Sequence, residues 1–176
     1  MISRPFQLCI MLLPALVLLA PRADGQAVSS LKGHDSRAPV DVAADRIELQ
    51  DRSDRAVLIG NVEIQQGNLT LQAPRVTVAY TRAGGTEIQR LDASGGVTVK
   101  SPSETARSQF AIYDFNRQQI TMIGNVIVDR NGSKVSGARL VIDLNTGQAS
   151  MGGSGSTAGA SNGRVTGRFT VPDRTP

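Results

Sequence analysis

The sequence predicts an all-β protein built from stacked short antiparallel hairpins. Between residues 40 and about 151, apolar and polar residues alternate with a period of two, as where Val62 and Ile64 flank Glu63. Turn sequences rich in glycine and asparagine bound most of these runs. No stretch after residue 27 keeps the 3.6-residue period of an amphipathic helix. Alternation bounded by turn residues is typical of strands that have one apolar face.

Length and composition agree with one domain of ordinary size. The chain has 176 residues, of which 40% are hydrophobic, 19% charged and only 3% aromatic, so it can form a core and is not disordered as a whole. Cys9 and His34 are the only residues of their types. The chain therefore forms no internal disulfide, and it has no site with several His or Cys ligands.

Residues 1–27 are predicted to be a secretory signal peptide. Arg4 precedes an apolar run from Phe6 to Ala20, and small residues follow at positions suited to cleavage after Gly25 or Ala27. The run is short for a membrane-spanning helix, which needs about 20 apolar residues. An uncleaved inner-membrane anchor is the alternative. We expect export to the periplasm, with Cys9 lost together with the signal peptide.

Residues 28–39 are mostly polar and rich in turn formers, so we expect a flexible arm with His34 solvated in it. With Cys9 removed and His34 in a tail, catalysis by a Cys–His pair is excluded.

The body, residues 40–151, contains an internal repeat. The string Ile59-Gly60-Asn61-Val62 recurs as Ile123-Gly124-Asn125-Val126, and Gly95-Gly96-Val97-Thr98-Val99 resembles a third copy. Spacings of roughly 30 to 36 residues indicate a stack of hairpin units, none of which can bury its apolar face alone. The turns are expected at Gln66-Gly67-Asn68, Ala83-Gly84-Gly85, Ser94-Gly95-Gly96, Asn131-Gly132 and Asn145-Thr146-Gly147.

The C-terminal part divides into a linker and a basic end. Residues 152–163 are rich in Gly, Ser and Ala, which is typical of a flexible linker. Residues 164–176 begin with an alternating segment that can add one last strand. Of the net charge of +4, residues 28–163 contribute only 14 basic against 13 acidic side chains, and the end from Arg164 contributes three arginines against Asp173. A nucleic-acid-binding face, which needs a dense basic patch, is not expected.

No motif for catalysis, cofactor binding or metal binding is found. The chain lacks a phosphate-binding loop, a G-x-S-x-G elbow and an HExxH motif. The acidic residues between Asp41 and Asp54 are interleaved with Arg46, Arg52 and Arg55, which favours a solvated, charge-balanced surface over a metal site. We therefore expect a protein that is not an enzyme and has no cofactor.

One aliphatic stripe runs through the predicted strands. Stacked hairpins that fold over lengthwise would turn it into a trough with open ends, able to accept acyl chains. We expect a lipid-binding slit formed by Val62, Ile64, Leu69, Leu71, Val76, Val78, Val97, Val99, Ile120, Met122, Val126, Val128, Leu140 and Ile142.

The chain resembles the LptA/OstA family over residues 40–151. The resemblance rests on the repeated I-G-N-V string, on the A-P-R-V and A-R-L strands at Ala73 and Ala138, and on the signal peptide. It implies a folded-over antiparallel β-jellyroll, or "taco", with a hydrophobic slit. It further implies a periplasmic bridge for lipopolysaccharide in Gram-negative outer-membrane assembly, head-to-tail self-association, and related β-slit domains at both membranes as partners.

Three alternatives stay open at this point. The chain could be the membrane-anchored inner-membrane relative of the same family. It could be a structural or adhesive β-solenoid whose aliphatic stripe is a closed core. A polysaccharide-processing β-helix would need convergent carboxylates at matched repeat positions, and none is found.

Overall fold

The computed structural model describes residues 27–28, 34–153 and 163–170. The predicted signal peptide lies outside the described residues except for Ala27, as does most of the predicted linker. Apart from one 3-10 turn, η1 (Asp51–Ser53), the described chain is strands and their connections. The strands are β1 (Ala27–Val28), β2 (Val40–Ala43), β3 (Arg46–Gln50), β4 (Arg55–Gln66), β5 (Leu69–Thr81), β6 (Glu87–Lys100), β7 (Glu104–Asp114), β8 (Gln119–Arg130), β9 (Ser133–Asp143), β10 (Gln148–Gly152) and β11 (Thr166–Arg168).

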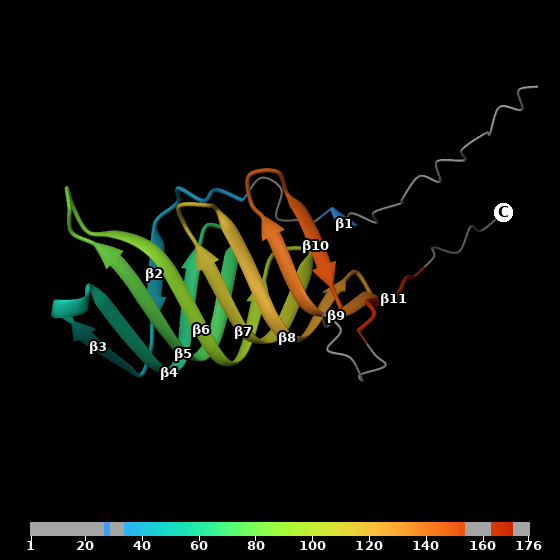
Figure 1. Cartoon of the computed structure of the whole chain (residues 1–176), viewed down its shortest axis with the longest axis horizontal. Helices are drawn as coiled ribbons and strands as arrows, with labels where there is room; N and C mark the ends of the chain where they lie inside the picture. The colour runs from blue at the N-terminus through green and yellow to red at the C-terminus, as the bar shows by residue number, and fades with distance from the viewer. Residues whose placement is uncertain (1–26, 29–33, 154–162, 171–176) are drawn as a thin grey trace, which may run out of the picture.

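All of these strands belong to one antiparallel sheet (Figure 1). Its order is β1-β10-β9-β8-β7-β6-β5-β4-β2, so consecutive strands are neighbours from β4 to β10. Two short strands lie off this path: β3 pairs with β4, and β11 pairs with β9. The predicted all-β, hairpin-built fold is confirmed.

A row of bulges crosses the sheet, and we call it the crease. In β4, β6 and β8 the residue pairs Gly60-Asn61, Gly95-Gly96 and Gly124-Asn125 have positive φ. The strand pairing shifts register at each pair, so that two residues face a single one on the next strand. The single residues are Pro74, Gln109 and Ala138.

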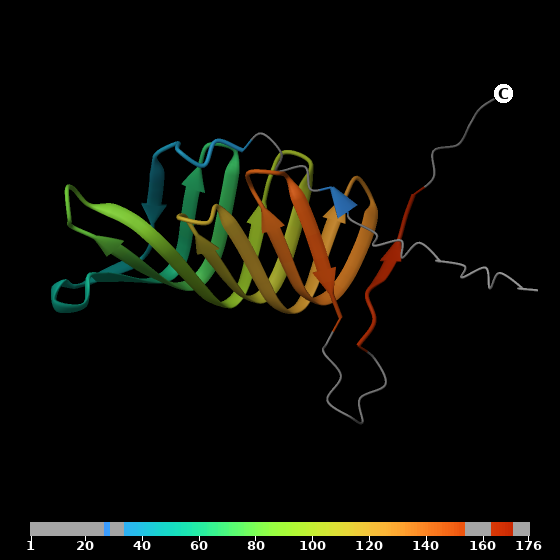
Figure 2. The ribbon, with the colours of Figure 1, turned by 45° about the horizontal axis from the view of Figure 1, so that its top comes forward.

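The crease divides the sheet into two halves that fold over one another (Figure 2). Half-sheet A ends in β2 at one edge and in β9 with β11 at the other. Half-sheet B ends in β3 at one edge and in β10 with β1 at the other. The long strands β4 to β9 contribute one segment to each half-sheet.

Four of the five predicted turns join consecutive strands, but Ser94-Gly95-Gly96 lies inside β6. This prediction was wrong, and the Gly-Asn pairs of the repeat likewise lie inside β4 and β8. Positive φ at two successive residues suits a tight hairpin turn, and here it bends a strand that continues. The strands from β4 to β9 are therefore 11 to 14 residues long, longer than the apolar runs suggested.

Inward-facing side chains from both half-sheets form one core between them. In the half-sheet A segment of β4, buried residues occupy every second position, as at Val62 and Ile64, whereas in its half-sheet B segment the consecutive residues Ala56, Val57 and Leu58 are all buried. Across the single-residue side of a bulge the phase changes, so that in β5 the inward residues pass from Ala73 to Val76. Within the described residues, no helix is long and apolar enough to span a bilayer.

The crease predicts a glycine requirement that goes beyond backbone conformation. Gly124 and Gly84 have nearly the same positive φ, 85° and 89°. A Cβ on Gly124 would lie 3.0 Å from the Cβ of Gln109, whereas one on Gly84 would meet nothing within 4 Å. Gly84→Ala should therefore lower the free energy of unfolding by about 1–2 kcal/mol through φ alone. Gly124→Ala should lower it by an additional 1–3 kcal/mol, roughly, through overpacking. Urea denaturation measures both variants, and equal losses would show that the crease tolerates a side chain.

Candidate functional site

The predicted slit residues all face the space between the half-sheets. Thirteen of the fourteen belong to the buried core, and Val128 is partly buried and packs against it. Along most of the molecule, from β4 to β8, these side chains fill the space between the half-sheets. Three of them, Val128, Leu140 and Ile142, border the cavity at the β9–β10 end.

That cavity lies at the β9–β10 end and has a volume of about 580 Å³. Half-sheet A contributes Ala106, Val128 and Val135, and half-sheet B contributes Leu140, Ile142, Ala149 and Met151. Phe169 and Thr170 of the C-terminal segment lie against the same space. A pocket of this size with aliphatic walls suits an apolar ligand.

An ion pair marks the polar border of the cavity. Arg130 donates from Nη2 to Glu104 Oε2 at 2.6 Å and from Nε at 3.0 Å. The Glu104 side chain is only 8% exposed, so the ion pair gives a buried carboxylate a partner of opposite charge. Glu104 and Arg130 are register partners on the neighbouring strands β7 and β8. The aliphatic walls are formed by the other residues that line the cavity.

A polar cluster joins the two half-sheets by hydrogen bonds near the middle of the molecule. Gln66, at the half-sheet A end of β4, accepts a 2.8 Å hydrogen bond at Oε1 from the hydroxyl of Tyr113 in half-sheet B. Its Nε2 donates to the carbonyl oxygens of Ser36 and Ala38 at 2.9 and 3.0 Å. We call this cluster, completed by His34, the clasp.

His34 belongs to the clasp, and the prediction of a solvated tail residue was wrong. Its side chain lies with Nε2 3.2 Å from Gln66 Oε1 and Nδ1 3.2 Å from Asn68 Oδ1, and the residue is only 7% exposed. Since Gln66 donates through Nε2 to two carbonyls, its Oε1 is the acceptor that His34 and Tyr113 share. His34 is buried because it contacts residues more than 30 positions away in the sequence, and the polar composition of its own segment does not reveal such contacts.

The Tyr113 ring is held from a second side. It stacks on Phe115, with ring centroids 4.0 Å apart and planes 18° from parallel. Burial raises the pKa of the Tyr113 phenol above its usual value. The hydroxyl therefore stays protonated at neutral pH and serves as the donor to Gln66.

The two ends of the folded sheet differ. At one end the edge strands β2 and β3 leave Val42, Ile47 and Leu49 exposed, with Leu49 at 69%. These residues pair in register with the buried Ile64, Leu58 and Ala56. They therefore extend the apolar inner face beyond the covered core.

At the other end, segments from outside the hairpin body cover both edges. β1 pairs with β10 in half-sheet B, and β11 pairs with β9 in half-sheet A. The apolar inner face is thus open at the β2–β3 end and bordered by the chain's own segments at the β9–β10 end.

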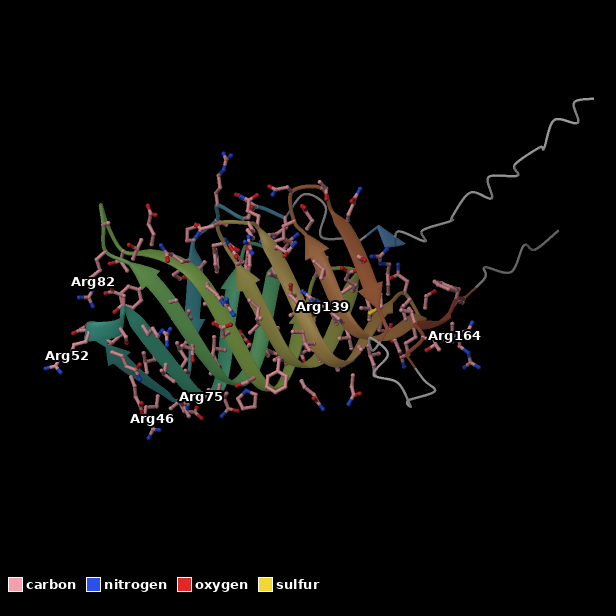
Figure 3. The ribbon with its side chains drawn as sticks, viewed as in Figure 1. Arg46, Arg52, Arg75, Arg82, Arg139 and Arg164 are labelled. Carbon is pink, nitrogen blue, oxygen red and sulfur yellow. The ribbon has the colours of Figure 1, made fainter. Side chains whose placement is uncertain are left out.

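Charged side chains are dispersed along the outside. Figure 3 shows the labelled arginines spread from Arg46, Arg52 and Arg82 at one end to Arg164 at the other. Arg82 pairs with Asp51 at 2.6 Å and with Asp54 at 3.3 Å. The acidic residues of this region are thus on a charge-balanced surface, and the described residues contain no cluster of three or more candidate metal ligands.

Sequence reasoning missed part of the cavity wall. Val135, Ala149 and Met151 belong to shorter or less regular alternating runs, and Phe169 follows the predicted linker. The alternation of Val165, Gly167 and Phe169 was the available signal for one face of a strand. It could not show which neighbouring strand that face would join.

Residues 41–148 match the family described as "LptA/(LptD N-terminal domain) LPS transport protein". The chain belongs to this family. It is also 31% identical over 144 residues to an uncharacterized protein of Rhizobium meliloti (strain 1021), covering 76% of this chain and 77% of that protein.

Among solved structures, the fold is similar to that of LptH, the LptA-homologous periplasmic component of the lipopolysaccharide transport device of Pseudomonas aeruginosa. The TM-score is 0.67 at 20% sequence identity, over 78% of this chain and 99% of LptH. The LptA-type fold expected from the resemblance is confirmed.

The clasp predicts a stability difference between neighbouring glutamines. Gln66→Met should lower the free energy of unfolding by about 2–4 kcal/mol, because it leaves the Tyr113 hydroxyl, His34 and two carbonyl groups without their partner. The control is Gln65→Met, at the adjacent exposed position of β4, which should change it by less than about 0.5 kcal/mol. Chemical denaturation compares the two. Similar values for both variants would mean that Gln66 does not hold the half-sheets together.

Proposed function

We propose that this protein is a periplasmic lipopolysaccharide carrier that forms part of a bridge from the inner to the outer membrane. The observation that carries the proposal is the aliphatic inner face of the folded sheet, which ends in a cavity at β9–β10 and in exposed apolar residues at β2–β3. Membership of the family of lipopolysaccharide transport proteins supports it.

The cavity suits acyl chains better than a polar ligand. Burying each methylene of an acyl chain contributes about 0.8 kcal/mol, and the walls at Leu140, Ile142 and Met151 supply apolar surface for it. Aliphatic walls make few directional contacts, so that a chain can slide along them. For more than this end of the slit to be occupied, the core side chains between the half-sheets must move apart.

Head-to-tail association would continue the inner face from one copy to the next. Edge strands present unpaired N–H and C=O groups, and β2 and β3 add apolar side chains on the inward side. Stacking copies lengthwise brings β2 of one to β9 of the next, and β3 to β10. Related β-slit domains of inner- and outer-membrane components would join the row by the same strand addition.

Export follows from the predicted signal peptide, which we expect to be cleaved after Gly25 or Ala27 and to leave the rest of the chain in the periplasm. The activity is transport by binding, without catalysis or a cofactor. A closed-core structural β-solenoid is the second candidate, but the 580 Å³ cavity gives it no support.

A photo-crosslinking amino acid at Ile142 should capture lipopolysaccharide in cells, because this side chain borders the cavity. The matched control is Val141, the adjacent residue on the outer face of the same strand, which should capture little or none. Immunoblotting for the lipid on the purified protein measures both. Equal labelling at the two positions would overturn the proposed binding site.

The exposed apolar edge predicts which residues support self-association. Leu49→Lys should weaken head-to-tail association at least about tenfold, since it places a charge on the inward side of β3. Gln50→Lys adds the same charge on the opposite side of β3 and should leave association unchanged. Sedimentation velocity over a concentration series gives both values. An equal effect of the two lysines would indicate net charge rather than the apolar edge.

A further inference from the structure

We propose that β11 is a self-inhibitory strand, which occupies the edge of β9 that would otherwise accept β2 of a second copy of this chain. The proposal rests on the proposed head-to-tail association and adds its regulation. It follows from the asymmetry of the two ends: β2 and β3 leave their outer edges open, while the opposite edges are covered by β11 and β1.

β11 lies on the part of β9 that half-sheet A needs for strand addition. Thr166, Gly167 and Arg168 pair with Ser136, Val135 and Lys134. Beyond the strand, the Thr170 N–H donates a 3.1 Å hydrogen bond to Ser133 Oγ. With β10 on residues 139–143, β11 takes the remaining edge of β9.

The hold of β11 is weak by comparison with the rest of the sheet. Its three residues are all exposed, and Gly167 at its centre has no side chain to pack. Phe169 borders the cavity yet remains 70% exposed. β11 therefore buries little apolar surface, and a longer strand with inward apolar residues can replace it.

The incoming β2 has the features that β11 lacks. It is four residues long and carries Val42 on the inward side, exposed in the free molecule. Placed on β9, that side continues the apolar wall at Val135 and Val128, where Phe169 now lies. A second copy thus covers the cavity more fully than the chain's own end does.

β11 competes because it is part of the same chain. The backbones of Gly153 and Gly163 lie so close that a Cβ on Gly153 would collide with the Gly163 carbonyl, so the chain returns to the point where β10 ends. A short tether gives a segment an effective concentration in the millimolar range. At low protein concentration, β11 therefore stays on the β9 edge and a second copy does not replace it. Association becomes favourable only where copies are concentrated or β11 has been displaced.

Occupation of the cavity is linked to this release. Phe169 and Thr170 border the same space as Leu140 and Ile142. An acyl chain that enters from this end displaces Phe169 and frees the β9 edge. Ligand binding and strand addition therefore favour one another by the same displacement.

A reversible disulfide tests the proposal in the full chain. Ser136 and Thr166 are register partners, and partners in antiparallel strands lie within disulfide range. In a Cys9→Ser background, Ser136→Cys/Thr166→Cys should associate at least about tenfold more weakly when oxidised than when reduced. That ratio corresponds to about 1.4 kcal/mol. The same protein in its reduced form is the control for folding, and sedimentation velocity is the measurement.

The converse variant releases the strand. Thr166→Pro/Phe169→Ser should strengthen association about tenfold, because proline removes the backbone donor of the residue that pairs with Ser136 and serine removes the cover of the cavity. Val165→Ser, an exposed apolar residue just before β11, is the matched control and should have no effect. Association that is the same in the oxidised, reduced and released forms overturns the self-inhibition.

The outcome separates this proposal from the proposed function. If lipopolysaccharide is captured at Ile142 while locking and release leave association unchanged, the carrier function stands and self-inhibition fails. If no lipid is captured, the carrier function fails, and the ratio of oxidised to reduced association still decides whether β11 covers the docking edge.

Discussion

The fold depends on the crease, where two residues with positive φ in every second strand face a single residue of the next. A flat sheet of this length would expose one apolar face along its whole extent. Because the bulges lie in a row, each long strand bends at the same place, and the sheet covers itself. The core, the cavity and the contact across the clasp all require this bend. Gly60, Gly95 and Gly124 therefore lie at the bend on which the interior depends.

Alternation made much of the structure predictable. A period of two depends only on neighbouring residues, so the aliphatic face from Val62 to Ile142 and most hairpin turns followed from the sequence. The bulges did not, because a Gly-Asn pair has the same local conformational preference in a turn and in a bend. Only the pairing of several strands decides whether the chain reverses. The surroundings of His34 and Phe169 could not be predicted for a related reason. Their positions are set by Gln66 and β9, which are distant in the sequence.

The interior combines a fixed part and an adaptable part. In the middle, Gln66 and Tyr113 join the half-sheets above tightly packed aliphatic side chains. At the β9–β10 end the half-sheets separate enough for a cavity, and a weakly held strand borders it. The carrier function that we propose needs both properties, since the protein would have to stay folded while a bulky apolar ligand enters and leaves. Placing the loosest contacts at an end also places them where another copy would dock.

The crease also sets how such a molecule can change in length. Each hairpin carries one two-residue bulge and one single-residue partner, so a pair of strands is a complete unit with its own bend. Adding or removing one unit of about 30 residues alters neither end, and it shifts the distance between them by about 10 Å, twice the spacing of neighbouring strands. Adding half a unit would instead place a strand end of the wrong direction at the docking edge. The length of the molecule therefore changes only in steps of one whole hairpin, and each hairpin contains one bulge with a glycine.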